Sequence, residues 1–350
     1  MKRLIHTMLL ILFVMGSCYA EKPKKYVPRS DRMKEKYATP EPGTYLKPVA
    51  YSLLVKMNKA MEDPDSFKEP SDWVKNMFTA PQKKLLDTLL QYNGTEVPVR
   101  IYYPTRQSLE GRHPVTLFFH GGGFIKGSVE QYHIMVSKLA RVTGNIMVSV
   151  EYRLAPEHPF PTGLMDCYAV LQWFQKNGIQ VGADTSRISV MGDSAGGNIA
   201  TVLTLICRDR KKPQPESQIL IYPGLSFADT SCASMGYFGK TADKNYVLSE
   251  SFLRKVKAEY LGKETNLRHP YLSPLEASLT ADLAPALIIT AECDPLRDGG
   301  RSYASALELA GVKVEYLEYS GMIHAFMSFH MVLGDALNAM KQVRNYLERL

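Results

Sequence analysis

The sequence predicts an α/β fold with a mostly parallel central sheet, and three features of the chain support this prediction. From residue 97 onward, short apolar runs alternate with longer stretches whose apolar residues recur at helical spacing. The short runs are apolar throughout, which is typical of strands covered by helices on both faces. One run leads through Gly-x-Ser-x-Gly directly into a helical stretch. We therefore expect functional side chains at the carboxyl ends of the strands.

The expected elements alternate along the chain. Strands are expected at Val97–Pro104, Pro114–Phe119, Asn145–Tyr152, Ile188–Met191, Ile219–Tyr222, Ala286–Ala291 and Val314–Tyr319. Helices are expected at Val129–Val142, Leu164–Lys176, Ile199–Cys207, Ser249–Leu261 and Leu333–Leu347. The last helix carries apolar residues at three- and four-residue spacing, which predicts an amphipathic helix that closes the fold.

Two regions outside this alternation are interpreted as a helical cap. Residues 21–95 begin as an arm rich in Pro, Lys and Tyr and continue with helical stretches at Val49–Met61 and Pro81–Leu90. An insertion of about 226–279 carries one further expected helix. The expected organisation is an N-terminal arm with cap helices over 21–95, followed by a catalytic domain over 96–350 that contains the insertion.

The first twenty residues have the pattern of a secretory signal peptide. Lys2 and Arg3 precede an apolar run at Met8–Met15, and small residues follow it. Cleavage after Ala20 would release a periplasmic or secreted protein. One alternative is an N-terminal anchor that is never cleaved. The other is a lipobox in which Cys18 becomes acylated, and membrane contact of the exported protein is expected only through that lipid.

Composition excludes several classes of protein. The chain carries a formal net charge of +7, but its basic residues are scattered, which favours a solvated surface over nucleic-acid binding. No pair of Cys or Cys and His has metal-binding spacing, so we expect no metal and no cofactor. Buried thiols rather than disulfides are expected at Cys167, Cys207, Cys232 and Cys293. Oligomeric state is not indicated.

The Gly-x-Ser-x-Gly motif places Ser194 on a sharp turn between a strand and a helix. Such a turn forces the serine into a strained backbone conformation and exposes its hydroxyl group. Gly192 and Gly196 are small because the strand and the helix must pass close together there. The N-terminus of the following helix favours negative charge beside the serine. Ser194 is therefore a candidate nucleophile.

A glycine run follows the strand that ends at Phe119. Gly121, Gly122 and Gly123 allow the backbone to turn N–H groups into a cavity without obstruction by side chains. Together with the N–H of Ala195, the N–H groups of this run could stabilise an oxyanion. His120 and Gly121 are interpreted as support for this loop, and His120 is not expected to act as a base.

A serine nucleophile needs a base, and the base needs a carboxylate to orient it. His324 follows the expected strand Val314–Tyr319, where a loop would deliver it to the site, whereas His269 and His330 are expected to be structural or exposed.

Three carboxylates compete for the role of the acid. Asp294 follows the strand Ala286–Ala291 and precedes Pro295, which stops the strand. Glu292 and Asp298 are its rivals, and Asp298 is expected to cap the next helix instead.

Five motifs in the chain resemble those of the hormone-sensitive lipase family of α/β-hydrolases. The match spans about 97–330, while the arm before Val49 and the secretory start are unusual for that family. Gly299 and Gly300 also stand where a Glu-Gly pair is common. The motifs are His-Gly-Gly-Gly-Phe at 120–124, Glu-Tyr-Arg-Leu-Ala-Pro-Glu at 151–157, Gly-Asp-Ser-Ala-Gly-Gly-Asn at 192–198, Asp-Pro-Leu-Arg-Asp at 294–298 and Gly-x-x-His at 321–324.

The resemblance implies a serine carboxylesterase with Ser194 as nucleophile, His324 as base and Asp294 as acid. It also implies oxyanion donors from Gly122, Gly123 and Ala195, and a helical cap. Short- to medium-chain esters are the expected substrates, and acetyl groups on plant polysaccharide or its oligosaccharides are a narrower hypothesis suggested by export alone. The alternatives are an amide or peptide hydrolase that uses the same three residues and a non-catalytic binding protein on the same fold.

Overall fold

The structure is a computed structural model that describes residues 24–25, 85–104, 111–228, 234 and 247–350. Its strands are β1 (Lys24–Lys25), β2 (Leu85–Tyr92), β3 (Thr95–Tyr102), β4 (His113–Phe119), β5 (Ile146–Val150), β6 (Ala183–Asp193), β7 (Gln218–Ile221), β8 (Ala286–Cys293) and β9 (Val314–Ile323). Its α-helices are α4 (Val129–Thr143), α5 (Thr162–Asn177), α6 (Ala195–Asp209), α7 (Glu250–Tyr260), α8 (Arg297–Leu309) and α9 (Gly334–Leu347). Short 3-10 helices are η2 (Gly178–Val181), η5 (Pro274–Glu276) and η6 (Phe326–Phe329).

The described strands form one sheet in the order β1-β9-β8-β7-β6-β4-β5-β3-β2. The block from β5 to β9 is parallel, and only β1, β2 and β3 run antiparallel to their neighbours. This arrangement is the mostly parallel sheet that the sequence predicts. It brings the carboxyl ends of β4, β6, β8 and β9 to one edge of the sheet, because parallel strands end on the same side.

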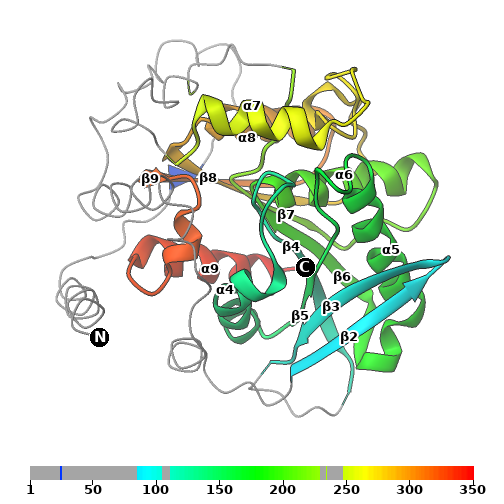
Figure 1. The fold of residues 1–350 in the computed structure, drawn as a ribbon. Coiled ribbons are helices and arrows are strands. Elements are labelled where there is room, and N and C mark those ends of the chain that lie inside the picture. The colour runs from blue at the N-terminus through cyan, green and yellow to red at the C-terminus, as the bar shows by residue number, and fades with distance from the viewer. Residues whose placement is uncertain (1–23, 26–84, 105–110, 229–233, 235–246) are drawn as a thin grey trace, which may run out of the picture.

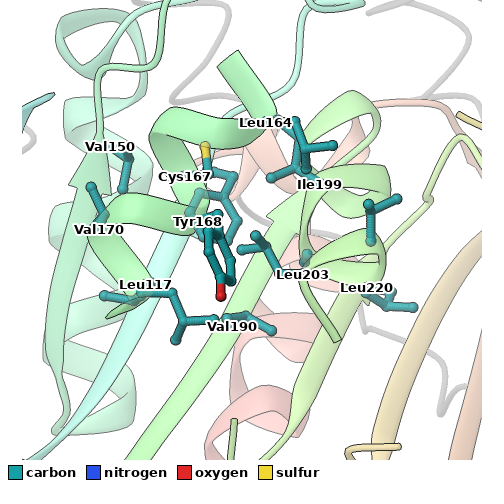
Figure 2. Packing of buried hydrophobic residues seen from close by; sticks show 14 of the residues in the cluster. Leu117, Val150, Leu164, Cys167, Tyr168, Val170, Val190, Ile199, Leu203 and Leu220 are labelled. Atoms are coloured by element: carbon teal, nitrogen blue, oxygen red, sulfur yellow. The ribbon is translucent and has the colours of Figure 1, made fainter. Parts of the chain in front are cut away.

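Two helix layers cover the sheet, as Figure 1 shows. Alternate residues of each strand point to opposite faces. Leu117 and Val190 pack with α5 and α6, while Phe118 and Met191 pack with α4 and α9. Figure 2 shows part of the first layer, where Cys167 and Tyr168 of α5 lie beside Leu203 of α6. Burial on both faces explains why these strands are apolar throughout.

The expected helix at Pro81–Leu90 is wrong for the residues that the structure describes. Leu85–Tyr92 is strand β2, which pairs with β3 in an antiparallel hairpin. Asn93 and Gly94 form its two-residue loop with φ values of 49° and 80°, and Asn-Gly is the residue pair that such a turn favours. Residues 85–95 therefore belong to the sheet and not to a cap. The signal peptide, the arm and the expected helix Val49–Met61 lie outside the described residues.

The start and the end of the insertion lie side by side. Phe227 N donates a hydrogen bond to Ser273 Oγ (2.8 Å), and Leu275 N donates one to Leu225 O (3.2 Å). The segment between them carries α7, which begins at an N-cap formed by Ser249 and matches the helix expected there. The insertion thus leaves the sheet and returns to it at one place.

Two further observations concern the described ranges only. None of their helices is long and apolar enough to cross a membrane, and none of their His, Cys, Asp and Glu side chains gather in threes or more as metal ligands would. Cys167 and Cys207 are buried free thiols, and Cys293 is buried as well. Cys232 lies outside these ranges.

Candidate active site

Ser194 lies on a strained turn between β6 and α6. Its φ and ψ are 53° and −116°, a backbone conformation that residues with a side chain rarely adopt. The turn is held because Ser194 N donates a hydrogen bond to Ile221 O (2.9 Å). A Cβ atom on Gly192 would lie 2.2 Å from the Gly196 backbone, and one on Gly196 would lie 1.9 Å from Phe119 O. The prediction that close approach requires both glycines is confirmed.

The fold brings Ser194, His324 and Asp294 into contact. The Ser194 Oγ lies 2.9 Å from His324 Nε2, and His324 Nδ1 lies 2.7 Å from Asp294 Oδ2. The other carboxylate oxygen of Asp294 accepts a hydrogen bond from Leu296 N (2.9 Å), which fixes its orientation. Asp294 and His324 are buried, whereas Ser194 is partly exposed. A serine in this arrangement can pass its proton to the imidazole.

The rival carboxylates make other contacts. Glu292 Oε2 accepts a hydrogen bond from Gly321 N (2.8 Å). Asp298 accepts one from Arg297 Nε (2.9 Å). It lies in the first turn of α8 and does not cap that helix, because the N-cap position is Leu296. The expected capping role of Asp298 is therefore wrong.

The two remaining candidate histidines also have structural surroundings. His269 Nδ1 accepts a hydrogen bond from Tyr271 N (3.0 Å). His330 follows η6 and is buried. Burial, together with the positive charge of Lys138, lowers the pKa of His330 to about 4.

The buried His330 gives the folded protein a measurable sensitivity to acid. Its folded-state pKa of about 4 lies below the ordinary value of 6.5, so the unfolded chain binds the proton more tightly and stability falls as the pH drops below 6.5. Between pH 7 and pH 5 we expect wild type to lose roughly 2 kcal/mol more of its unfolding free energy than His330→Gln loses. Urea unfolding at both pH values measures this difference, and equal losses in the two proteins would contradict it.

The glycine loop carries N–H groups that have no hydrogen-bond acceptor among the described residues. Gly122 and Gly123 have φ values of 118° and 66°, which only glycine adopts readily. A Cβ on Gly122 would lie 2.2 Å from Lys126 O. Among the described residues, none accepts a hydrogen bond from the N–H of Gly122, Gly123 or Ala195. These donors are therefore available to an oxyanion.

His120 lies beneath the loop and does not contact Ser194. Its ring stacks on that of Tyr152 with centroids 4.3 Å apart, and its Nδ1 lies 2.8 Å from Gly121 O. Tyr152 Oη donates a hydrogen bond to His120 O (2.7 Å). Burial lowers the pKa of His120 to about 4, so its ring is neutral at pH 7. The position fits a loop support and not a base.

A cavity of about 420 Å³ opens above Ser194. Ser194, Gly123 and Ala195 line it, and residues of α7 form much of its wall. The wall is largely hydrocarbon, with charged groups from α7 in addition. The apolar lining residues are Phe124, Phe227, Leu248, Phe252, Leu253, Val256 and Leu296, and the charged ones are Glu250, Arg254 and Lys257.

Sequence reasoning did not single out three side chains that organise this site. Asn198 Nδ2 donates hydrogen bonds to Gly224 O (2.7 Å) and to Leu272 O (2.9 Å), which ties the elbow helix to the end of the insertion. Asp193 and Tyr132 meet behind the glycine loop. Asp193 directly precedes the serine in the Gly-Asp-Ser-Ala-Gly motif, so the sequence could have indicated that it belongs to the site. Tyr132 lies within an ordinary helix and gives none.

A serine on a strand–helix turn at the carboxyl edge of a mostly parallel sheet defines the class of α/β-hydrolases. A family model described as alpha/beta hydrolase fold matches residues 116–328. The chain is 38% identical over 265 residues to the carboxylesterase NlhH of Mycobacterium tuberculosis, covering 74% of this chain and 80% of that protein. It is 33% identical over 265 residues to an ethyl acetate hydrolase of Pseudomonas putida, covering 75% and 81%.

A solved structure of an esterase also resembles this chain in fold and sequence. An esterase of Pyrobaculum calidifontis superposes with a TM-score of 0.79 at 33% identity, covering 87% of this chain and 98% of that one. The chain therefore belongs to the hormone-sensitive lipase family of α/β-hydrolases. It is a carboxylic ester hydrolase.

Proposed function

We propose that this protein hydrolyses short- to medium-chain carboxylic esters through an acyl-enzyme formed on Ser194. The observation that carries the proposal is the continuous chain of contacts from Ser194 Oγ to His324 Nε2 (2.9 Å) and from His324 Nδ1 to Asp294 Oδ2 (2.7 Å). This chain of contacts ends at an apolar cavity large enough for a small ester.

The geometry supports a two-step reaction. His324 takes the proton of Ser194 as the oxygen attacks the ester carbonyl carbon, and Asp294 stabilises the imidazolium. The N–H groups of Gly122, Gly123 and Ala195 stabilise the oxyanion. His324 then gives its proton to the departing alcohol. In the second step it takes a proton from water as the water oxygen attacks the acyl carbon, and it returns this proton to the Ser194 oxygen as the carboxylic acid leaves.

The cavity favours alkyl or aryl esters over acetylated polysaccharide. Its wall around Ser194 is built mainly from Phe124, Phe227, Phe252 and aliphatic side chains, which bind hydrocarbon better than they bind sugar hydroxyl groups. One relative carries the name ethyl acetate hydrolase, and that name agrees with a small acyl group.

The proposal is tested with p-nitrophenyl esters from acetate to palmitate, the matching anilides, and acetylated xylan. We expect kcat/KM to be highest between acetate and hexanoate, and a phosphonate probe to label Ser194. A maximum at palmitate would contradict the acyl range. Anilide turnover as fast as ester turnover would favour the amide hydrolase, and faster acetate release from xylan would favour the polysaccharide substrate.

Phe252 on α7 is expected to limit the length of the acyl chain. Its ring lines the cavity and lies beside Gly123, where a Cβ would be 3.0 Å from Phe252 Cζ. Phe252→Ala opens space for about two more methylene groups, each worth about 0.8 kcal/mol. We therefore expect the ratio of kcat/KM for octanoate to that for butyrate to rise about 10-fold.

Lys255→Ala provides the matched control for this variant. Lys255 lies on the same helix, pairs with Glu259 (3.7 Å) and does not line the cavity. The control should leave the octanoate-to-butyrate ratio unchanged. An unchanged ratio in Phe252→Ala would show that the acyl chain does not occupy this part of the cavity.

A further inference from the structure

A carboxylate without a cationic partner lies behind the glycine loop. Asp193 is the last residue of β6 and is 1% exposed. Its Oδ1 accepts a hydrogen bond from Gly121 N (2.8 Å), and its Oδ2 accepts one from Tyr132 Oη (3.1 Å). Among the described residues, no Lys or Arg forms an ion pair with it. The described contacts of this charge are thus with the loop and with α4.

Tyr132 completes a triangle around the same peptide group. Gly121 N also donates to Tyr132 Oη (3.1 Å), so its N–H is shared between the carboxylate and the phenol. A Cβ atom on Gly121 would lie 2.8 Å from Asp193 Oδ2 and 2.8 Å from Tyr132 Oη. The contact is therefore tight enough to fix the position of this peptide group.

Each end of the Asp193–Gly121 hydrogen bond is one residue away in sequence from a functional group of the site. Gly121 directly precedes Gly122 and Gly123, whose N–H groups are available to an oxyanion, and Asp193 directly precedes Ser194. The Asp193–Gly121 hydrogen bond thus sets the spacing between the donor loop and the nucleophile. Misplacing oxyanion donors costs rate without a comparable loss of substrate binding.

The two hydrogen bonds of Asp193 do not by themselves require an ionised side chain at position 193. An asparagine has the same shape, and it could accept from Gly121 N and donate to Tyr132 Oη. Burial disfavours the carboxylate and raises the pKa of Asp193 to about 6, against which the positive charge of His324 acts. The other titratable groups that act on Asp193 are the phenols Tyr132, Tyr152 and Tyr222.

We propose that Asp193 and Tyr132 are positioning residues for ester hydrolysis, which hold the Gly121 peptide so that the oxyanion donors stay beside Ser194. This inference rests on the proposed function of Ser194, His324 and Asp294, and it assigns a role to residues that do not touch the substrate.

The test compares Asp193→Ala, Asp193→Asn and Tyr132→Phe on p-nitrophenyl butyrate. We expect Asp193→Ala to lower kcat about 100-fold with little change in KM, because the donors lose their anchor. Tyr132→Phe should lower kcat about 10-fold, since one of two acceptors for Gly121 N remains. Asp193→Asn should recover most of the loss in kcat. A buried Tyr outside the site, changed in Tyr303→Phe, serves as the control and should leave kcat unchanged.

Affinity for a transition-state analogue separates a positioning role from a purely structural one. Affinity for a trifluoromethyl ketone, which forms a tetrahedral adduct, should fall with kcat/KM in Asp193→Ala and Tyr132→Phe. A purely structural role would lower the melting temperature and leave the affinity for the ketone unchanged.

Labelling with a phosphonate distinguishes failure of this inference from failure of the proposed function. If wild type is not labelled at Ser194, the proposed function fails. If it is labelled but Asp193→Ala and Tyr132→Phe keep kcat within 2-fold of wild type, the positioning role is overturned. Should Asp193→Ala not fold, Tyr132→Phe decides, and wild-type kcat together with wild-type affinity for the trifluoromethyl ketone overturns the inference.

Discussion

Ser194→Ala is expected to lower kcat for p-nitrophenyl butyrate on the order of 10⁶-fold, because it removes the atom that forms the acyl-enzyme. Fold and stability should remain close to wild type. The Ser194 hydroxyl has its described hydrogen bond with His324 alone, and alanine meets the same backbone strain as serine at a φ of 53°. Steady-state assays measure kcat, and thermal unfolding followed by circular dichroism measures stability.

Ser189→Ala is the matched control for this prediction. Ser189 lies on the same strand, is buried, and accepts a hydrogen bond from Ser217 Oγ (2.9 Å) away from the site. Its loss should cost about 1 kcal/mol of stability and leave kcat unchanged. Turnover by Ser194→Ala within 100-fold of wild type would mean that another group is the nucleophile.

Asp294→Asn is expected to lower kcat by about 10⁴-fold. Leu296 N donates to Asp294 Oδ1, so the oxygen of an asparagine would stay there and its NH₂ group would face His324 Nδ1. That nitrogen would then have to accept a hydrogen bond, which places the ring proton on Nε2. A protonated Nε2 cannot take the proton of Ser194, although the three side chains remain in place.

Glu292→Gln tests whether the acid is correctly chosen. Glu292 lies at the end of the same strand but accepts its hydrogen bond from Gly321 N, and glutamine can make the same contact. We expect kcat to change less than 10-fold. A large loss in Glu292→Gln together with a small one in Asp294→Asn would transfer the role of the acid to Glu292.

The parallel strands and the helices between them could be predicted because their signals are local. A buried strand such as Ile219–Tyr222 is apolar on both faces, and the structure has β7 at Gln218–Ile221. The strand Leu85–Tyr92 was not predicted, because its residues also favour a helix and its stability comes from pairing with β3. The Asn93-Gly94 pair was the overlooked signal for that hairpin.

Within the site, the sequence indicated which residues have the required chemistry but not what lies behind them. Ser194, Asp294 and His324 each follow a strand, and the parallel order of β6, β8 and β9 brings all three to one edge. Tyr132 has no such marker. Its hydroxyl reaches Asp193 only because α4 packs against the sheet beside Met191 and Phe118.

By itself, the sequence determined the features that short-range sterics control: the elbow that only Gly192 and Gly196 allow, the glycine loop, and the order of strands and helices. Only the tertiary structure decided the hairpin of β2 and β3, the wall that α7 gives to the cavity, and the triangle of Asp193, Tyr132 and Gly121. The physical reason is range. A backbone turn depends on neighbouring residues, whereas these contacts join segments far apart in the chain, and folding alone brings them together.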